Sequence, residues 1–98
     1  MNASTRATIC NKKGLHARAA AKLVKTAVSF DAKVQVVRLP RAGEGGEPTS
    51  AGATSILSLL MLAADLGVEV ELNAVGPQAQ EAIDAIAALI RRRFEEDE

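Results

Sequence analysis

Two periodicities of apolar residues alternate along this 98-residue chain, and their order restricts the possible folds more than any other feature. Apolar residues at every second position predict strands, because successive side chains of a strand point to opposite faces of a sheet. Apolar residues at helical spacing predict helices between those strands. The alternating segments are residues 5–9, 32–36 and 68–72, with a weaker strand near 47–51. The helical segments are residues 17–28, 56–66 and 77–94.

The resulting order, β-α-β-β-α-β-α, predicts an α+β fold with one mostly antiparallel sheet and helices on one face. The length fits a single domain over residues 1–98. Ser55 or Thr54 can cap the second helix and Gly67 can end it, while Pro77 can open the third. The expected inward faces hold Ala17, Ala20, Ala21, Val24, Ala27 and Val28 in the first helix, Leu59, Leu62 and Leu66 in the second, and Ala79, Ala82, Ile83, Ile86, Leu89, Ile90 and Phe94 in the third.

The composition argues against several classes of function. Phe30 and Phe94 are the only aromatic residues, so the core is aliphatic and no platform for stacking nucleic-acid bases is available. Twelve acidic and twelve basic residues cancel, which leaves no overall field toward nucleic acid or an anionic membrane. No signal peptide opens the chain and no apolar run is long enough to span a bilayer, so a cytoplasmic protein is expected. Residues 91–93, all arginine, and the acidic residues 95–98 are expected to form a solvated terminus.

Metal and hydrolase chemistry find little support in the residue types. His16 is the only histidine and Cys10 the only cysteine, so no set of metal ligands and no internal disulfide is predicted. Cys10 is expected in a strand, as a buried structural thiol. The residue types alone leave a serine hydrolase possible, but the sequence has no nucleophile-elbow motif. We therefore predict no metal and no cofactor.

His16 lies between a loop that ends at Gly14 and the first predicted helix. A lone histidine is often incidental, but this ring lies beside the free N–H groups of a first helical turn, which attract anions together with the helix dipole. Ala17 and Arg18 supply backbone N–H groups, and the Arg18 guanidinium adds donors that suit phosphate oxygens. Imidazole titrates near neutrality, so a ring nitrogen is available as a nucleophile.

Residues 11–20, Asn-Lys-Lys-Gly-Leu-His-Ala-Arg-Ala-Ala, resemble the active-site stretch of HPr, the histidine phosphocarrier of the phosphoenolpyruvate-dependent phosphotransferase system. Residues 54–63 resemble the second signature of that family, with the spacing to Gly67 kept. The resemblance covers nearly the whole chain. It implies an HPr-like open-faced sandwich, with a four-stranded antiparallel sheet and three helices on one face. It also implies a phosphoryl carrier in place of an enzyme with its own substrate.

The resemblance implies roles for individual residues. His16 would be phosphorylated on the ring nitrogen nearer the main chain, and Arg18 would steady the phosphoryl group. The donor would be enzyme I, charged by phosphoenolpyruvate, and the acceptors would be IIA-type proteins. Ser55 matches the serine that HPr kinase/phosphorylase modifies in some bacteria, although a serine at this place is equally a helix cap. A monomer is expected.

Three departures from the family pattern stand out. Ala19 replaces the usual proline, which leaves the chemistry of His16 intact, and Thr54 replaces the usual lysine beside Ser55. The loop over residues 40–49 is several residues longer than usual, and no role is assigned to it. The two substitutions favour the nitrogen-related regulatory branch of the family, but sugar uptake stays open.

Residues 56–62 are apolar almost all round, so a helix that lies on a sheet must leave some of them exposed. Ile56, Leu57 and Leu60 are expected to point outward and to form a partner-docking surface beside His16. The alternative is a helix buried on both sides. A second candidate function follows, a regulatory module that docks through residues 56–60 without phosphoryl transfer. The presence of both His16 and Arg18 favours the carrier.

Overall fold

The predicted order of strands and helices is confirmed in the structure, a computed structural model that describes residues 1–41, 43 and 45–96. The strands are β1 (Asn2–Thr8), β2 (Lys33–Arg38), β3 (Thr49–Gly52) and β4 (Glu69–Val75). The helices are α1 (Ala17–Val28), α2 (Ile56–Met61) and α3 (Ala79–Arg91), and a short helical turn, η1 (Arg93–Glu95), follows α3. In the part of the chain so described, no helix combines the length and the apolar content needed to cross a membrane.

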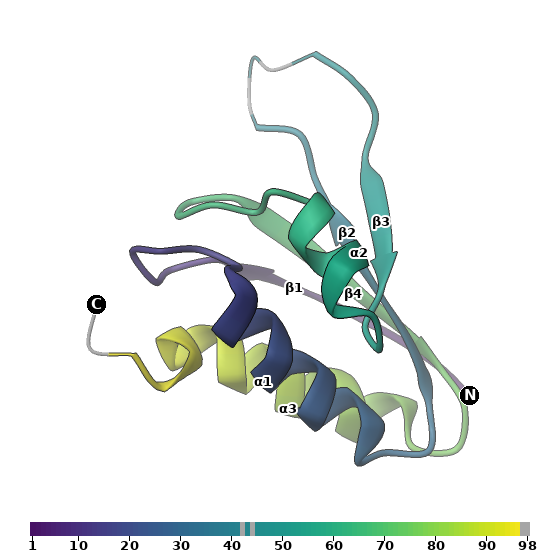
Figure 1. The fold of residues 1–98 in the computed structure, drawn as a ribbon. Coiled ribbons are helices and arrows are strands. Elements are labelled where there is room, and N and C mark those ends of the chain that lie inside the picture. The colour runs from purple at the N-terminus through teal and green to yellow at the C-terminus, as the bar shows by residue number, and fades with distance from the viewer. Residues whose placement is uncertain (42, 44, 97–98) are drawn as a thin grey trace.

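The four strands form one antiparallel sheet in the order β1-β4-β2-β3. β4 lies in the interior, with Leu72 opposite Thr5 of β1 on one side and opposite Val36 of β2 on the other. The helices lie on one side of this sheet, and the β2–β3 hairpin projects beyond them (Figure 1). Alternation within β4 explains the layering, because Val70 and Leu72 are buried while Glu69 and Glu71 point to the open face. The α+β open-faced sandwich is confirmed.

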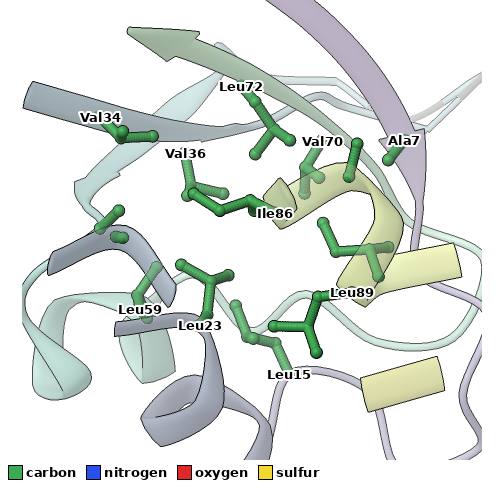
Figure 2. Close-up of a cluster of buried hydrophobic side chains, with 14 of the residues drawn as sticks. Ala7, Leu15, Leu23, Val34, Val36, Leu59, Val70, Leu72, Ile86 and Leu89 are labelled. Atoms are coloured by element: carbon green, nitrogen blue, oxygen red, sulfur yellow. The ribbon is translucent and has the colours of Figure 1, made fainter. Parts of the chain in front are cut away.

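The core between the sheet and the helices is mainly aliphatic, as the composition predicts, with Phe94 as a fully buried aromatic residue beyond the end of α3. Val36 and Leu72 of the sheet face Leu23 and Ile86 of the helices across it (Figure 2). The inward face predicted for the third helix is confirmed in full. Each of its predicted residues is at most 3% exposed: Ala79, Ala82, Ile83, Ile86, Leu89, Ile90 and, beyond the end of α3, Phe94. α3 begins at Ala79, two residues after Pro77.

The predicted inward face of α1 is partly wrong. Ala17, Ala21 and Val28 are exposed, whereas Ala19 and Leu23, which were not predicted, are buried. The first turns of α1 carry alanines on every side, at positions 17, 19, 20 and 21, so the spacing of the alanines alone does not show which face is buried. The observed rotation places Leu23, the largest apolar side chain of the helix, in the core, where it buries the most surface.

The second helix is shorter than predicted. α2 ends at Met61, and Ala63 has a left-handed φ of 51°, so residues 63–66 form a loop. Leu59 and Leu62 are buried as expected, but Leu66 is 51% exposed, which corrects its predicted inward position. The left-handed Ala63 ends the helical path, and beyond it the carbonyl oxygen of Ala64 accepts a hydrogen bond from the Leu15 N–H at 2.9 Å.

Two weaker expectations have mixed outcomes. The strand expected near 47–51 is present as β3, while residues 42 and 44 of the long loop lie outside the described part of the chain.

Cys10 lies beyond the end of β1, so its placement in a strand was wrong. Its thiol is half-buried and donates a hydrogen bond to the carbonyl oxygen of Ile90 at 3.2 Å, which ties β1 to the end of α3.

Two leucines of α2 test this arrangement. Leu59 is 0% exposed and Leu57 is 69% exposed. Leu59→Ala removes core packing and should lower the free energy of unfolding by about 2–5 kcal/mol, whereas Leu57→Ala should change it by less than about 0.5 kcal/mol. Urea denaturation of the two variants checks this, and equal losses would show that α2 is buried on both sides.

Candidate functional site

The loop before α1 is held against the loop after α2, and this contact positions His16. Gly14 is buried with a left-handed φ of 66°, and its N–H donates to the carbonyl oxygen of Asn11 at 3.1 Å. A Cβ at Gly14 would lie 2.8 Å from the Ala64 carbonyl oxygen and 2.8 Å from the Asp65 Cα. Glycine is therefore required here for two reasons, the backbone angle and the close approach. The next residue, Leu15, enters the core beside Leu89 (Figure 2).

His16 is the N-cap of α1. Its backbone is extended, its carbonyl oxygen accepts the Ala20 N–H at 2.8 Å, and its Nδ1 accepts the Arg18 N–H at 3.3 Å. A nitrogen that accepts a hydrogen bond carries no proton, so Nδ1 presents its lone pair toward the positive end of the helix. The side chain is 25% exposed, which leaves the ring within reach of a partner.

The other ring nitrogen contacts a residue that the sequence analysis did not identify. Nε2 of His16 lies 2.5 Å from Oε2 of Glu96. The second carboxylate oxygen, Oε1, accepts a hydrogen bond from Nδ2 of Asn11 at 2.9 Å, and that same amide group donates to the Gly14 carbonyl oxygen at 2.8 Å. Glu96 is only 14% exposed, so the predicted solvated terminus is wrong at this residue. Residues 97 and 98 lie outside the described part of the chain.

The end of the chain turns back sharply to bring Glu96 to the ring. Arg93, Phe94 and Glu95 all have left-handed φ angles, between 53° and 64°. Phe94 is 0% exposed, and its carbonyl oxygen accepts a hydrogen bond from Nζ of Lys22 at 2.6 Å. The apolar Phe94 beyond the end of α3 was the one sequence signal that this segment packs on the domain, since separation by 80 residues hides the contact itself.

The charge state of Glu96 follows from its surroundings. Partial burial alone would raise the pKa of this carboxyl. The hydrogen bonds from Asn11 and His16, with the positive charge of Lys13, outweigh that effect, so the pKa lies below its usual value. The carboxyl is thus ionised near neutral pH, and the proton between it and the ring belongs to Nε2.

Ala17 and Arg18 occupy the exposed first turn of α1, as the anion-binding prediction requires. Among the described residues, no hydrogen bond or ion pair holds the Arg18 guanidinium, so it is available to a bound anion. Within the same described ranges, no three His, Cys, Asp or Glu side chains come together in a way that could hold a metal ion.

The predicted docking residues lie on the neighbouring helix. Ile56, Leu57 and Leu60 are 41%, 69% and 37% exposed, and Met61, which was not predicted, is 77% exposed. α1 and α2 pack against each other (Figure 1), and the loop that follows α2 contacts Gly14 and Leu15 just before α1. Ser55 caps α2, where its Oγ accepts the Ser58 N–H at 3.1 Å. The three predicted residues are thus exposed, their role in docking stays a prediction, and Ser55 acts as a helix cap.

Comparison with known proteins finds one family. The family model described as "PTS HPr component phosphorylation site" matches residues 3–92. A protein of Shewanella violacea named phosphocarrier protein NPr is 46% identical over 89 residues, which cover 91% of this chain and 89% of the relative. A protein of Cupriavidus necator named phosphocarrier protein HPr is 46% identical over 91 residues, which cover 93% of each chain.

Solved structures give the same result for the fold. The crystal structure of HPr-C-His from Thermoanaerobacter tengcongensis superposes with a TM-score of 0.83 at 33% identity, and the match covers 98% of this chain and 99% of the other.

A comparison of Gly14 with Gly67 separates the two reasons for glycine at position 14, which are the left-handed backbone and the close approach of residues 64 and 65. Gly67 has a φ of 90° and open space around its missing Cβ, so Gly67→Ala should cost roughly 1–2 kcal/mol from backbone strain alone. Gly14→Ala adds the collision with residues 64 and 65 and should cost clearly more, with a changed amide spectrum around His16. Denaturation and amide NMR spectra of the two variants check this. Equal losses of stability, with an unchanged spectrum around His16, would contradict the close approach.

Proposed function

Because the chain belongs to the HPr family of phosphocarrier proteins, we propose that Nδ1 of His16 accepts a phosphoryl group from phospho-enzyme I and passes it to a IIA-type protein. The family members are phosphoryl carriers and not enzymes with their own substrates. We further propose that residues 1–98 form one domain that works in the cytoplasm as a monomer.

The observation that carries the proposal is the hydrogen bond from the Arg18 N–H to Nδ1, because it keeps that nitrogen unprotonated at the start of a helix. In the forward step the Nδ1 lone pair forms the N–P bond while the bond from phosphorus to the donor's carrier atom breaks. The electron pair of the broken bond returns to that atom of the donor. Reversal of these roles delivers the group to the acceptor, so no water and no additional proton is needed.

The first turn of α1 supplies the groups that receive the phosphoryl oxygens. When Nδ1 carries the phosphoryl group, the Arg18 N–H can transfer its hydrogen bond from the ring to a phosphoryl oxygen, and the Ala17 N–H lies beside it. The Arg18 guanidinium supplies a planar set of donors that matches these oxygens. Catalysis is then mainly positioning and charge stabilisation, much of it from the partner.

The apolar surface of Ile56, Leu57 and Leu60 is proposed as the docking site for both the donor and the acceptor. These side chains lie on the helix packed against α1, so a partner seated there would lie close to the helix that His16 caps. Phosphorylation of Ser55 by an HPr kinase/phosphorylase is a further proposal. It would place negative charge at the edge of the same surface and weaken docking.

The proposed function leaves two physiological roles to distinguish, sugar uptake and nitrogen-related regulation. Relatives named NPr and HPr are equally similar to the chain, at 46% identity each. Ala19 and Thr54 favour regulatory signalling over sugar uptake, on the family pattern described above. A comparison of phosphorylation rates with purified enzyme I proteins from the two branches distinguishes them.

Phosphorylation of His16 is the central prediction. Incubation with phosphoenolpyruvate and purified enzyme I should add one acid-labile phosphoryl group to the wild type and none to His16→Ala, as measured by intact mass. Arg18→Ala should still be phosphorylated, but at least about tenfold more slowly, with little loss of stability because the side chain is exposed. An adduct that persists in His16→Ala would refute the assignment. Binding of enzyme I without any adduct would favour the alternative, a regulatory module.

Docking is tested by a charge at Leu57. Leu57→Glu should fold normally, because the side chain is 69% exposed, and should bind enzyme I at least about tenfold more weakly. Val28→Glu is the matched control, since Val28 is 61% exposed at the far end of α1. Calorimetry on both variants and on Ser55→Asp measures the effect. Equal affinities for Leu57→Glu and Val28→Glu would remove the docking assignment.

A further inference from the structure

The Glu96 carboxylate is the one group at the ring that the proposed transfer leaves without a role. Both of its oxygens are engaged, Oε2 by Nε2 of His16 at 2.5 Å and Oε1 by Nδ2 of Asn11 at 2.9 Å. Asn11 is itself completely buried and also donates to the Gly14 carbonyl oxygen. The carboxylate is therefore fixed relative to the same loop that carries His16.

The segment before Glu96 holds it in place at a cost in backbone strain. Three consecutive residues with side chains, Arg93 to Glu95, adopt left-handed φ angles, which L-amino acids disfavour. The strain is offset by the burial of Phe94 and by the hydrogen bond from Lys22 to the Phe94 carbonyl oxygen. Strained turns of this kind persist where the surroundings over-determine them, and they are found often at functional sites.

Two contacts on opposite sides of the ring select one state of His16. The Arg18 N–H points at Nδ1 and requires an unprotonated nitrogen, while the Glu96 carboxylate requires a proton on Nε2. The hydrogen bond that one ring nitrogen makes determines which form the other nitrogen takes. Both contacts therefore favour the tautomer whose lone pair is on Nδ1.

We propose that Glu96 is a positioning residue for phosphoryl transfer, which holds the His16 ring with Nε2 protonated and stabilises the positive charge that the ring gains as the N–P bond forms. The proposal rests on the proposed function. Nε2 keeps its proton throughout the step, so the ring becomes cationic when Nδ1 bonds to phosphorus. A carboxylate already in contact with Nε2–H needs no reorganisation to stabilise that charge.

The other charged groups around the ring make this contribution specific. Lys13 of the preceding loop acts on Glu96 by its positive charge, and Lys22 of α1 donates a hydrogen bond to the Phe94 carbonyl oxygen in the turn that carries Glu96. Positive charges on this side of the domain oppose a positive charge on the ring. Glu96 supplies the negative charge on the side of the ring away from Nδ1.

Glu96→Gln tests the proposal, with Glu95→Gln as the matched control. Both substitutions remove one negative charge from the same turn, but Glu95 is exposed, and among the described residues it forms no hydrogen bond or ion pair with His16. Phosphoramidate serves as the phosphoryl donor, because it needs no docking and so isolates the chemical step. We expect wild type and both variants to reach one phosphoryl group on His16, with Glu96→Gln about tenfold slower than the other two at neutral pH.

A spectroscopic measurement separates positioning from a merely structural role. In the unphosphorylated protein, the Nε2–H proton of His16 should give a low-field NMR signal that exchanges slowly with water in wild type and Glu95→Gln. In Glu96→Gln it should move upfield and exchange faster. Equal rates and an unchanged Nε2–H signal in Glu96→Gln would overturn the role of Glu96 and leave the phosphocarrier function standing. Equal slowing in both variants would also overturn it, as an effect of net charge, while absence of phosphorylation on wild-type His16 would refute the proposed function itself.

Discussion

Burial of the inner face of the sheet beneath α1 and α3 is the interaction on which every other feature depends. The helices can approach closely because the facing positions hold many alanines, among them Ala19, Ala20 and Ala82, which are fully buried. Close-packed aliphatic contacts leave little freedom for α1 to rotate or slide on the sheet. The start of α1 therefore has a defined place, and with it His16, the N-cap residue of that helix.

A second constraint converts that place into a site. The loop that ends at Gly14 lies against the loop after α2, where only glycine fits, and the Ala64 carbonyl oxygen ties the two loops together. One contact thus joins the start of α1, which carries His16, to the segment that follows the apolar face of α2. Under the proposed function, a partner that recognises Ile56, Leu57 and Leu60 would meet His16 as a consequence of this arrangement.

The ring itself is held by groups from both ends of the chain. The Arg18 N–H approaches Nδ1 from within α1, and Glu96 approaches Nε2 from the turn after α3. Under the proposed function, a defined tautomer means that the accepting step begins from the lone pair on Nδ1 and that the releasing step restores it there. The chain itself would then prepare the nucleophile, and the partners would supply most of the alignment.

The sequence by itself determined the order of elements, the aliphatic core, the place of His16 and Arg18 at a helix start, and the exposed face of α2. Each of these features depends on local spacing or on a short motif, which can be recognised in the sequence without knowing how distant segments pack. The tertiary structure alone decided which alanines of α1 face inward, where α2 ends, and that Glu96 reaches the ring. These depend on competition for buried surface and on contacts across as many as 80 residues, such as that of His16 with Glu96, which no local pattern encodes.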